Sequence, residues 1–185
     1  MATSGPRPQR ADWQRNHEQL VATATKLIAR SGAQVSFEEV ARRAGVGSAT
    51  LHRHFPSRRA LLEEVFHDVV ERLRRRGDEL SAGDPRTGLF TWLEELTISA
   101  AETRGLTVAL EACADDVASP GDSCHGMVRE ATVSLMDRAL AVDALRPEVA
   151  PDDLLTLVTA ISLVAEGDSA AARRLLRLAL DGVRP

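Results

Sequence analysis

Hydroxyl, imidazole and guanidinium side chains are concentrated in a short stretch near residue 50. Ser48, Ala49 and Thr50 stand at the start of a predicted helix, and Arg53 and His54 follow about one turn later. Small side chains at a helix start allow the backbone to approach a nucleic acid closely. The hydroxyl and methyl groups of Thr50 suit a base edge, and Arg53 and His54 suit phosphate oxygens. The set indicates contacts with a nucleic acid.

Two short helices on either side of a tight turn are expected to present these residues. Ser36 and Glu39 form the S-x-x-E pattern of a capping box, so a helix is predicted to begin here and to run over 37–44. Gly45 supplies the positive φ angle that a sharp turn needs. A second helix is predicted over 48–54, and it ends at 55–57 because proline disfavours a helical residue before it.

Helical spacing separates the inward from the outward residues of the second helix. Leu51 and Phe55 lie four residues apart and are expected to face the core, which leaves the polar positions facing out. The pair fits helix-turn-helix geometry, in which the start of the second helix reaches base edges. An ordinary helical corner, whose outward residues are only hydrated, gives the same pattern. Geometry alone therefore leaves both interpretations open.

The sequence VSFEEVARRAGVGSATLHRHFPSRRALLEEVF, residues 35–66, resembles the N-terminal domain of TetR-family transcriptional regulators. The resemblance is ungapped and includes the AGV turn, the TLHRHF helix and the F-P-S-basic-x-x-L-L start of the following helix. It implies contacts with phosphates, bases or the DNA backbone at Ser36, Phe37, Ser48, Ala49, Thr50, His52, Arg53, His54 and Arg58. His52 stands where the family usually has tyrosine, and Glu38 is acidic close to the DNA side, so the operator sequence does not follow from the resemblance.

The apolar periodicity and the resemblance together predict an all-α protein of about nine helices. An N-terminal three-helix helix-turn-helix domain is expected over 12–57, followed by a helical-bundle ligand-binding and dimerisation domain over 58–185. Residues 1–11 contain two prolines and two arginines without apolar periodicity, and are expected to form a disordered basic arm. These boundaries divide the chain into an arm and two domains.

Within the two domains, apolar spacing locates the remaining helices. Trp13, Leu20 and Ala24 recur at helical spacing and predict a first helix over about 12–31, with Gly32 taking the left-handed cap. A helix beginning at Arg58 is expected to bridge the domains, although 81–85 is the clearest break in composition. Another helix is expected over 106–117.

The net charge of −4 divides unevenly along the chain. Residues 1–77 hold 14 Arg or Lys against 8 Asp or Glu, a net +6, whereas residues 78–185 hold 9 against 19, a net −10. A basic first part supports contact with a polyanion. No apolar run is long enough to span a membrane, and the first residues lack the apolar core of a signal peptide, so a cytoplasmic location is expected.

No catalytic group, metal site or cofactor is expected. A small helical enzyme is one alternative function, and Glu63 with His67 would supply a carboxylate and an imidazole, but no nucleophile motif accompanies them. A thiol-based redox sensor is another alternative, since Cys113 and Cys124 lie on neighbouring segments. They form no CxxC pair, and nothing nearby obviously lowers the pKa of a thiol.

The resemblance implies a pocket for a small-molecule effector among the fourth to seventh helices. Aromatic and thioether side chains there suit an apolar or flat aromatic effector, although each also fits plain core packing. The candidate lining residues are Trp92, Leu96, Leu110, Cys113, Met127, Val128 and Met136.

The last two predicted helices are apolar on most sides and must be buried on more than one side. A central position within the monomer and a two-fold four-helix interface both provide such burial, and the interface is favoured. The interface residues are then Leu154, Leu157, Val158, Ile161, Leu175, Leu178 and Leu180. The partners expected are double-stranded operator DNA, a second copy of the chain and the effector. Repression is the family's usual mode of action.

Overall fold

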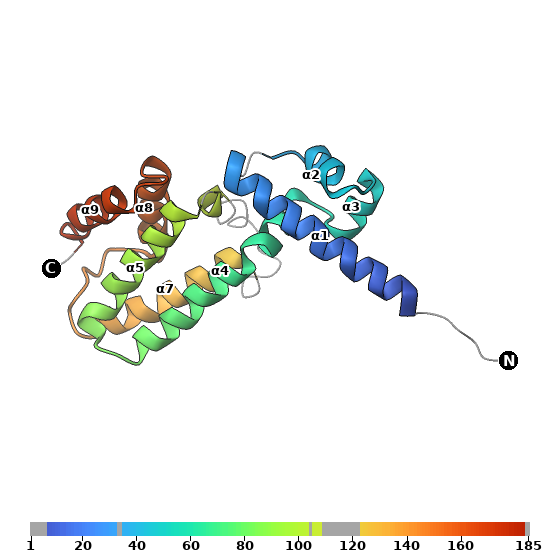
Figure 1. Cartoon of the computed structure of the whole chain (residues 1–185). Helices are drawn as coiled ribbons and strands as arrows, with labels where there is room; N and C mark the ends of the chain where they lie inside the picture. Colours follow the sequence, from blue (N-terminus) through green and yellow to red (C-terminus); the bar gives the residue numbers. More distant parts are fainter. Residues whose placement is uncertain (1–6, 33–34, 104, 109–122, 184–185) are drawn as a thin grey trace. The chain divides into compact units, whose positions relative to one another are not determined.

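The computed structural model describes residues 7–32, 35–103, 105–108 and 123–183, and over these residues the predicted all-α class is confirmed (Figure 1). Its helices are α1 (Arg7–Ser31), α2 (Phe37–Ala44), α3 (Ser48–His54), α4 (Arg58–Ser81), α5 (Pro85–Glu102), α7 (Cys124–Leu140), α8 (Pro151–Val164) and α9 (Ser169–Leu180). Most of the helix expected over 106–117 lies outside the described residues. The chain forms two compact units, residues 1–65 and 66–185.

The ends of α2 and α3 follow the local signals in the sequence. Ser36 caps α2, because its side chain accepts a hydrogen bond from the N–H group of Glu39 at 3.2 Å. The reciprocal half of the capping box is replaced, since the Glu39 carboxylate pairs with Arg42 and Arg43. Gly45 ends α2 with a φ angle of 69°. The turn therefore has the left-handed geometry predicted from glycine.

The core of the first unit is built from the inner faces of α1 to α4. Leu20 and Ala24 of α1 are buried, as are Val40 of α2 and Leu51 of α3. The side chain of Gln19 donates a hydrogen bond to the carbonyl of Ala44 at 2.9 Å, which satisfies an acceptor at the end of α2. Apolar burial and this cap together hold α1 against α2.

The boundary between the units falls inside α4, between residues 65 and 66, rather than between 57 and 58 as expected from the sequence. Ser57 caps α4 as expected, with its side chain accepting from the N–H group of Ala60 at 3.1 Å. Leu61 and Leu62 in the first turns of α4 are buried. These turns therefore complete the core of the first unit, and the capping signal marks only where the helix starts.

The first helix also begins earlier than expected. α1 already includes residues 7–11, which were assigned to a disordered arm, and residues 1–6 lie outside the described part. Pro8 is the second residue of α1. Proline is tolerated in the first turn, because the N–H group that it lacks has no partner there. Two prolines in the sequence therefore did not prevent the helix.

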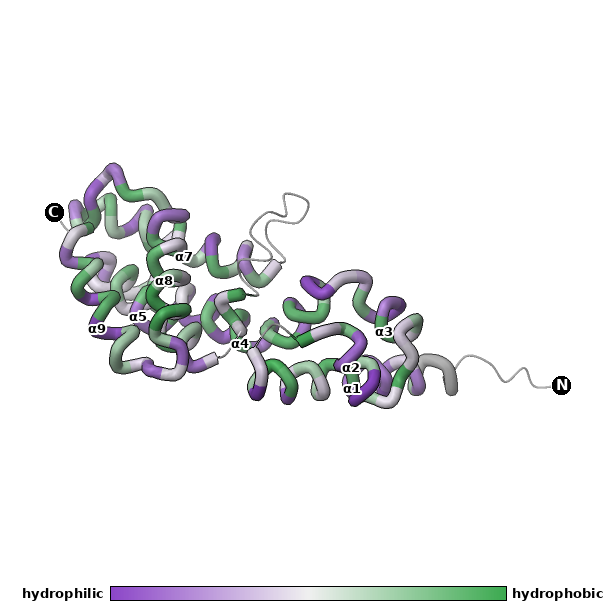
Figure 2. The backbone as a smooth tube through the Cα atoms, turned by 90° about the horizontal axis from the view of Figure 1, so that it is seen from above, coloured by the Kyte–Doolittle hydropathy of each residue, from purple (hydrophilic) through white to green (hydrophobic). Residues whose placement is uncertain are grey.

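In the second unit, α5 packs against α7, α8 and α9. Leu89, Leu93 and Leu96 on α5 are fully or almost fully buried, with Leu154 of α8 and Leu176 of α9. α8 is hydrophobic along most of its length (Figure 2). Asp168 caps α9 through the N–H group of Ala171 at 2.9 Å. The second unit is thus a helical bundle around α5.

The second half of α4 is bound tightly to this bundle. The indole N–H of Trp92 donates to the carbonyl of Leu73 at 3.2 Å. Arg76 forms a two-pronged contact with the carboxylate of Glu95, at 2.9 Å from Nε and 3.0 Å from Nη2. A Cβ on Gly77 would lie 2.9 Å from the Cβ of Ala131 on α7. α4 therefore approaches α5 and α7 closely because residue 77 has no side chain.

We expect Gly77→Val to lower the free energy of unfolding by about 2 kcal/mol, since overpacking a tight contact costs about 1–3 kcal/mol. Urea unfolding followed by circular dichroism measures this change. Arg75→Val is the matched control, because Arg75 is exposed on the same turn of α4 and should change stability by less than about 0.5 kcal/mol. Equal stabilities of the two variants would show that α4 has room at residue 77.

Candidate nucleic-acid interface

α3 has one buried side and one open side. Leu51 is 1% exposed and Phe55 is also buried, as the helical spacing predicted. Ser48, Ala49, His52 and Arg53 are exposed, whereas Thr50 and His54 are half-buried. Because all these side chains come from one seven-residue helix, the small residues at its start and the basic residues at its end lie within two turns.

The start of α2 contributes the next two predicted residues. Ser36 is exposed at the cap of α2, and Phe37 is the half-buried first residue of the helix. The ring centroids of Phe37 and His52 lie 5.2 Å apart. The structure thus brings Phe37 and the position where the family usually has tyrosine into ring contact. This contact links the start of α2 to the outward side of α3.

The charged residues of this region differ in how far they are neutralised. Arg53 and Arg58 are exposed and form no ion pair within the described residues. Glu39 contacts Arg42 and Arg43, and the hydrogen bond from Arg42 is the main cause that holds the pKa of Glu39 below its ordinary value. Glu38 is exposed, so an acidic side chain does lie beside the cap of α2.

His54 belongs to a ring cluster that the sequence analysis missed. Trp13 and His17 of α1 approach it, with a distance of 4.6 Å between the ring centroids of Trp13 and His54. Burial, and then the neighbouring His17 and Arg53, hold the pKa of His54 below its ordinary value. Trp13 was expected to belong to the apolar face of the first helix, but it is 46% exposed. The i, i+4 spacing of Trp13 and His17 was the only signal of this cluster.

The candidate pocket residues in the second unit fall into two groups, those that the structure describes and those that it does not. Trp92, Leu96, Met127, Val128 and Met136 are all buried on α5 and α7. Leu110 and Cys113 lie outside the described residues. Since the indole N–H of Trp92 is bonded to α4, part of its role is to hold two helices together.

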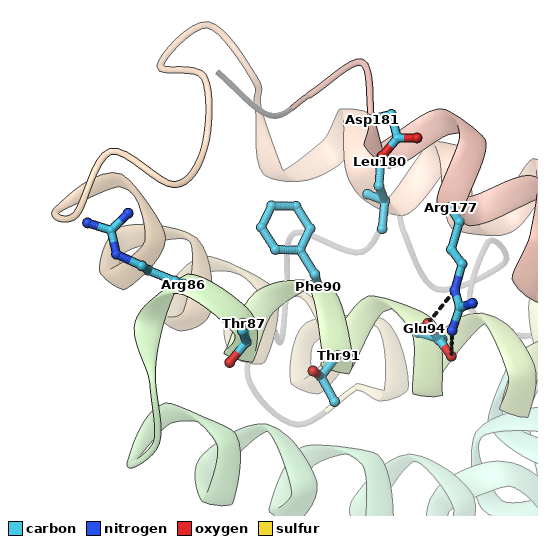
Figure 3. A pocket seen from close by; sticks show the side chains of 8 residues that line it. All are labelled: Arg86, Thr87, Phe90, Thr91, Glu94, Arg177, Leu180 and Asp181. Carbon is cyan, nitrogen blue, oxygen red and sulfur yellow. Dashed lines mark hydrogen bonds and ion pairs between the residues drawn. The ribbon is translucent and has the colours of Figure 1, made fainter.

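Two open grooves flank α5, each of about 450 Å³. One lies between α5 and α9, where the ion pair of Glu94 with Arg177 stands beside Phe90 (Figure 3). The other lies between α4 and α5, beside Arg76 and Glu95. Neither groove contains a residue of the predicted effector pocket. Charged and polar side chains contribute to both linings, unlike the apolar set expected for the effector.

The predicted dimer residues are divided between the core and the surface. Leu154, Val158, Ile161 and Leu180 are buried within the unit, and Leu157 is half-buried. Leu175 and Leu178 are exposed, together with Leu163 and Val164, which were not predicted as interface residues. One side of the last helices is therefore core, and another side is open, so the two-fold interface stays a prediction.

Other features bear on the alternative functions. Cys124 is 1% exposed at the start of α7, and Cys113 lies outside the described residues. Among the described residues, no group of three or more histidine, cysteine, aspartate or glutamate side chains has a geometry suited to a metal ion. In the same part of the chain, every helix is too short or too polar to cross a membrane.

Two family models match the chain. Residues 20–65 match the model described as bacterial regulatory proteins of the tetR family, and residues 84–185 match the SbtR-like transcriptional regulator C-terminal domain. No protein of curated function is significantly similar to the chain. The first match contains α2, α3 and the start of α4, and the second contains the bundle around α5.

Solved structures agree with both matches. A TetR transcriptional regulator from Streptomyces coelicolor is 32% identical over 91% of this chain and 98% of its own, with a TM-score of 0.56. A TetR regulatory protein from Mycobacterium vanbaalenii is 31% identical over 96% of this chain and 100% of its own, with a TM-score of 0.50. RolR bound to resorcinol shares the fold at 18% identity, covering 91% and 89% of the two chains with a TM-score of 0.59. On these matches, the chain belongs to the TetR family of non-enzymatic, DNA-binding transcriptional regulators.

Proposed function

We propose that this regulator is a homodimeric repressor that binds a palindromic operator and is released by a small-molecule effector. The observation that carries the proposal is α3, whose buried Leu51 and Phe55 leave small and basic side chains on the opposite side. A helix of this kind enters the major groove by its first residues. The operator, the direction of regulation and the effector all belong to the proposal.

Within this proposal the exposed residues divide into two roles. Ser48, Ala49 and Thr50 at the start of α3 face base edges, and Thr50 offers both a hydroxyl and a methyl group. His52, Arg53, His54 and Arg58 bind phosphates or bases, with Ser36 and Phe37 beside the backbone at the start of α2. Arg58 suits a phosphate because its guanidinium is exposed and has no ion-pair partner among the described residues.

The first test is an anisotropy titration of the purified protein against its own upstream DNA, at two salt concentrations and with non-specific competitor. Binding that is tight, dependent on a palindrome and sensitive to salt supports the proposal. If no duplex from upstream DNA or from a selected random pool binds better than competitor, the proposal fails.

Two variants separate the phosphate and base contacts. Arg58→Ala should weaken binding to every duplex alike and reduce the salt slope by about one, because one counterion-releasing contact is lost. Thr50→Ala should instead change the preference at particular bases by about 1–3 kcal/mol. Arg86→Ala removes an exposed guanidinium from α5 and should leave both quantities unchanged. Identical, sequence-independent losses in the first two variants would contradict these roles.

The dimer interface is proposed on the open side of α8 and α9. Leu157, Ala160 and Val164 follow each other at helical spacing on α8, and Val164 is 83% exposed. Leu175 and Leu178 form a matching row on α9, where Leu178 is 67% exposed. Because α8 packs against α9, the two rows together suit a four-helix interface with a second copy.

Leu178→Glu should convert the dimer to a monomer, because burying an unpaired carboxylate in an apolar interface is strongly unfavourable. Analytical ultracentrifugation measures the change in mass at a fixed protein concentration. Ala82→Glu adds the same carboxylate at an exposed position between α4 and α5, and this control should remain dimeric. A Leu178→Glu protein that sediments as a dimer would exclude this side of α9 from the interface.

The effector is proposed to be an apolar or flat aromatic molecule held near Leu96, Met127, Val128 and Met136; the other predicted lining residues, Leu110 and Cys113, lie outside the described residues. Resorcinol, the ligand in the RolR structure, is a molecule of this class. We propose that α4 transmits effector binding to the recognition helices, since contacts at Trp92 and Gly77 join its second half to α5 and α7. A shift of α4 would change the spacing of the two recognition helices from the roughly 34–36 Å that successive major grooves require.

A further inference from the structure

A cluster of rings joins α1 to the end of α3 within residues 1–65. The ring of Trp13 is stacked on that of His17 at 5.2 Å between centroids and lies 4.6 Å from that of His54. The ring of His17 lies 4.9 Å from that of Phe55 and 5.7 Å from that of His54. Trp13 keeps nearly half of its surface exposed. It therefore lies over the two imidazoles instead of filling the core.

The hydrogen bonds of the two imidazoles are incomplete. His17 Nε2 lies 3.3 Å from Oε1 of Glu64 on α4. A carboxylate accepts but does not donate, so the ring proton of neutral His17 is at Nε2. Nδ1 of His17 and Nδ1 of His54 are both buried, without a hydrogen-bond partner in the described part of the chain.

The surroundings of His54 disfavour its cationic form. The titratable and charged groups that contact the cluster or act on His54 are His17, Arg53 and Glu64. The ion pair Asp12–Arg15 flanks Trp13 along α1. Burial lowers the pKa of His54 most, followed by the charges of His17 and Arg53. Glu64 is in contact with His17, where it offsets a charge on that ring. In the protein without DNA, these surroundings therefore favour the neutral ring of His54.

We infer that DNA binding by this chain takes up a proton at His54, and that His17 is the positioning residue that sets the pH at which this happens. The inference rests on the proposed function, because it requires a phosphate beside the end of α3. A phosphate next to His54 favours the cationic ring, whereas the unbound protein favours the neutral ring. Its pKa is thus higher in the complex than in the free protein. Affinity for DNA rises as the pH falls through the interval between these two values.

His17 acts through His54 and not through the DNA. Its ring contacts both His54 and Phe55, so it supports the end of α3, and its charge opposes a proton on His54. His17→Phe keeps an aromatic ring in this place but removes the charge and the contact with Glu64. The pH at which binding strengthens should therefore move upwards in this variant, because a charge that opposes a proton on His54 is removed.

The test measures the affinity for a labelled mixed-sequence duplex from about pH 8 to about pH 6 at fixed salt. Calorimetry in two buffers of different ionisation enthalpy then counts the protons taken up. Affinity should rise by about 3-fold to 10-fold over this range, which is within the limit of about tenfold per pH unit that one proton permits. His54→Gln should bind more weakly and take up fewer protons than the wild type. His67→Gln, an exposed histidine of α4 outside the cluster, should retain the wild-type profile.

The outcomes distinguish this inference from the proposed function. Binding without proton uptake, or an unchanged midpoint in His17→Phe, overturns the inference and leaves DNA binding intact. Absence of binding at every pH overturns both. The Cε1 proton resonances of the five histidines in the wild-type chain give a measurement that needs no folded variant. The resonance of His54 should titrate at higher pH when the duplex is present, and an unmoved midpoint rejects the inference.

Discussion

Gly45 leaves the end of α2 at a φ angle of 69°, and the N–H groups of Gly45 and Val46 bond to the carbonyls of Arg42 and Ala41 at 3.3 and 3.0 Å. A Cβ at residue 45 would meet no atom within 4 Å, so a larger residue has room there. It would still be strained, because side-chain-bearing residues rarely adopt this positive φ angle. This turn sets the direction in which α3 leaves α2. Burial of Leu51 and Phe55 then sets the rotation of α3, so the outward side of α3 depends on one backbone angle and two side chains.

Structure that depends on neighbours a few residues apart could be predicted from the sequence. The caps at Ser36 and Ser57 and the left-handed turn at Gly45 are local, and each lies where the helix starts and the turn were expected. The division of α4 between the units depends instead on what Leu61 and Leu62 pack against. Likewise, an apolar position such as Leu154 or Val158 does not itself tell whether it faces its own subunit or a partner. Those distinctions need the tertiary contacts.

The candidate interface shows the same limit. The exposure of Ser48, Ala49 and Arg53 follows from helical spacing once Leu51 faces inwards. The environment of His54 could not be predicted in this way, because it involves rings about forty residues earlier in the chain. Trp13 was counted with the apolar face of α1, yet its neighbours are two imidazoles on the surface. A residue that breaks the burial pattern was therefore the clearest pointer to an unpredicted contact.

Ion pairing explains why a chain with a net charge of −4 can bind a polyanion. In residues 66–185, Arg76 is bonded to Glu95, and Arg173 and Arg177 share the carboxylate of Glu94, so these guanidinium groups already have carboxylate partners within the bundle. Exposed ion pairs add little stability, but a paired guanidinium must give up its partner before it can bind a phosphate. Arg53 and Arg58 need no such exchange within the described part of the chain. Salt screens charges beyond about 8–10 Å, so a phosphate beside α3 responds to these local side chains more than to the total charge.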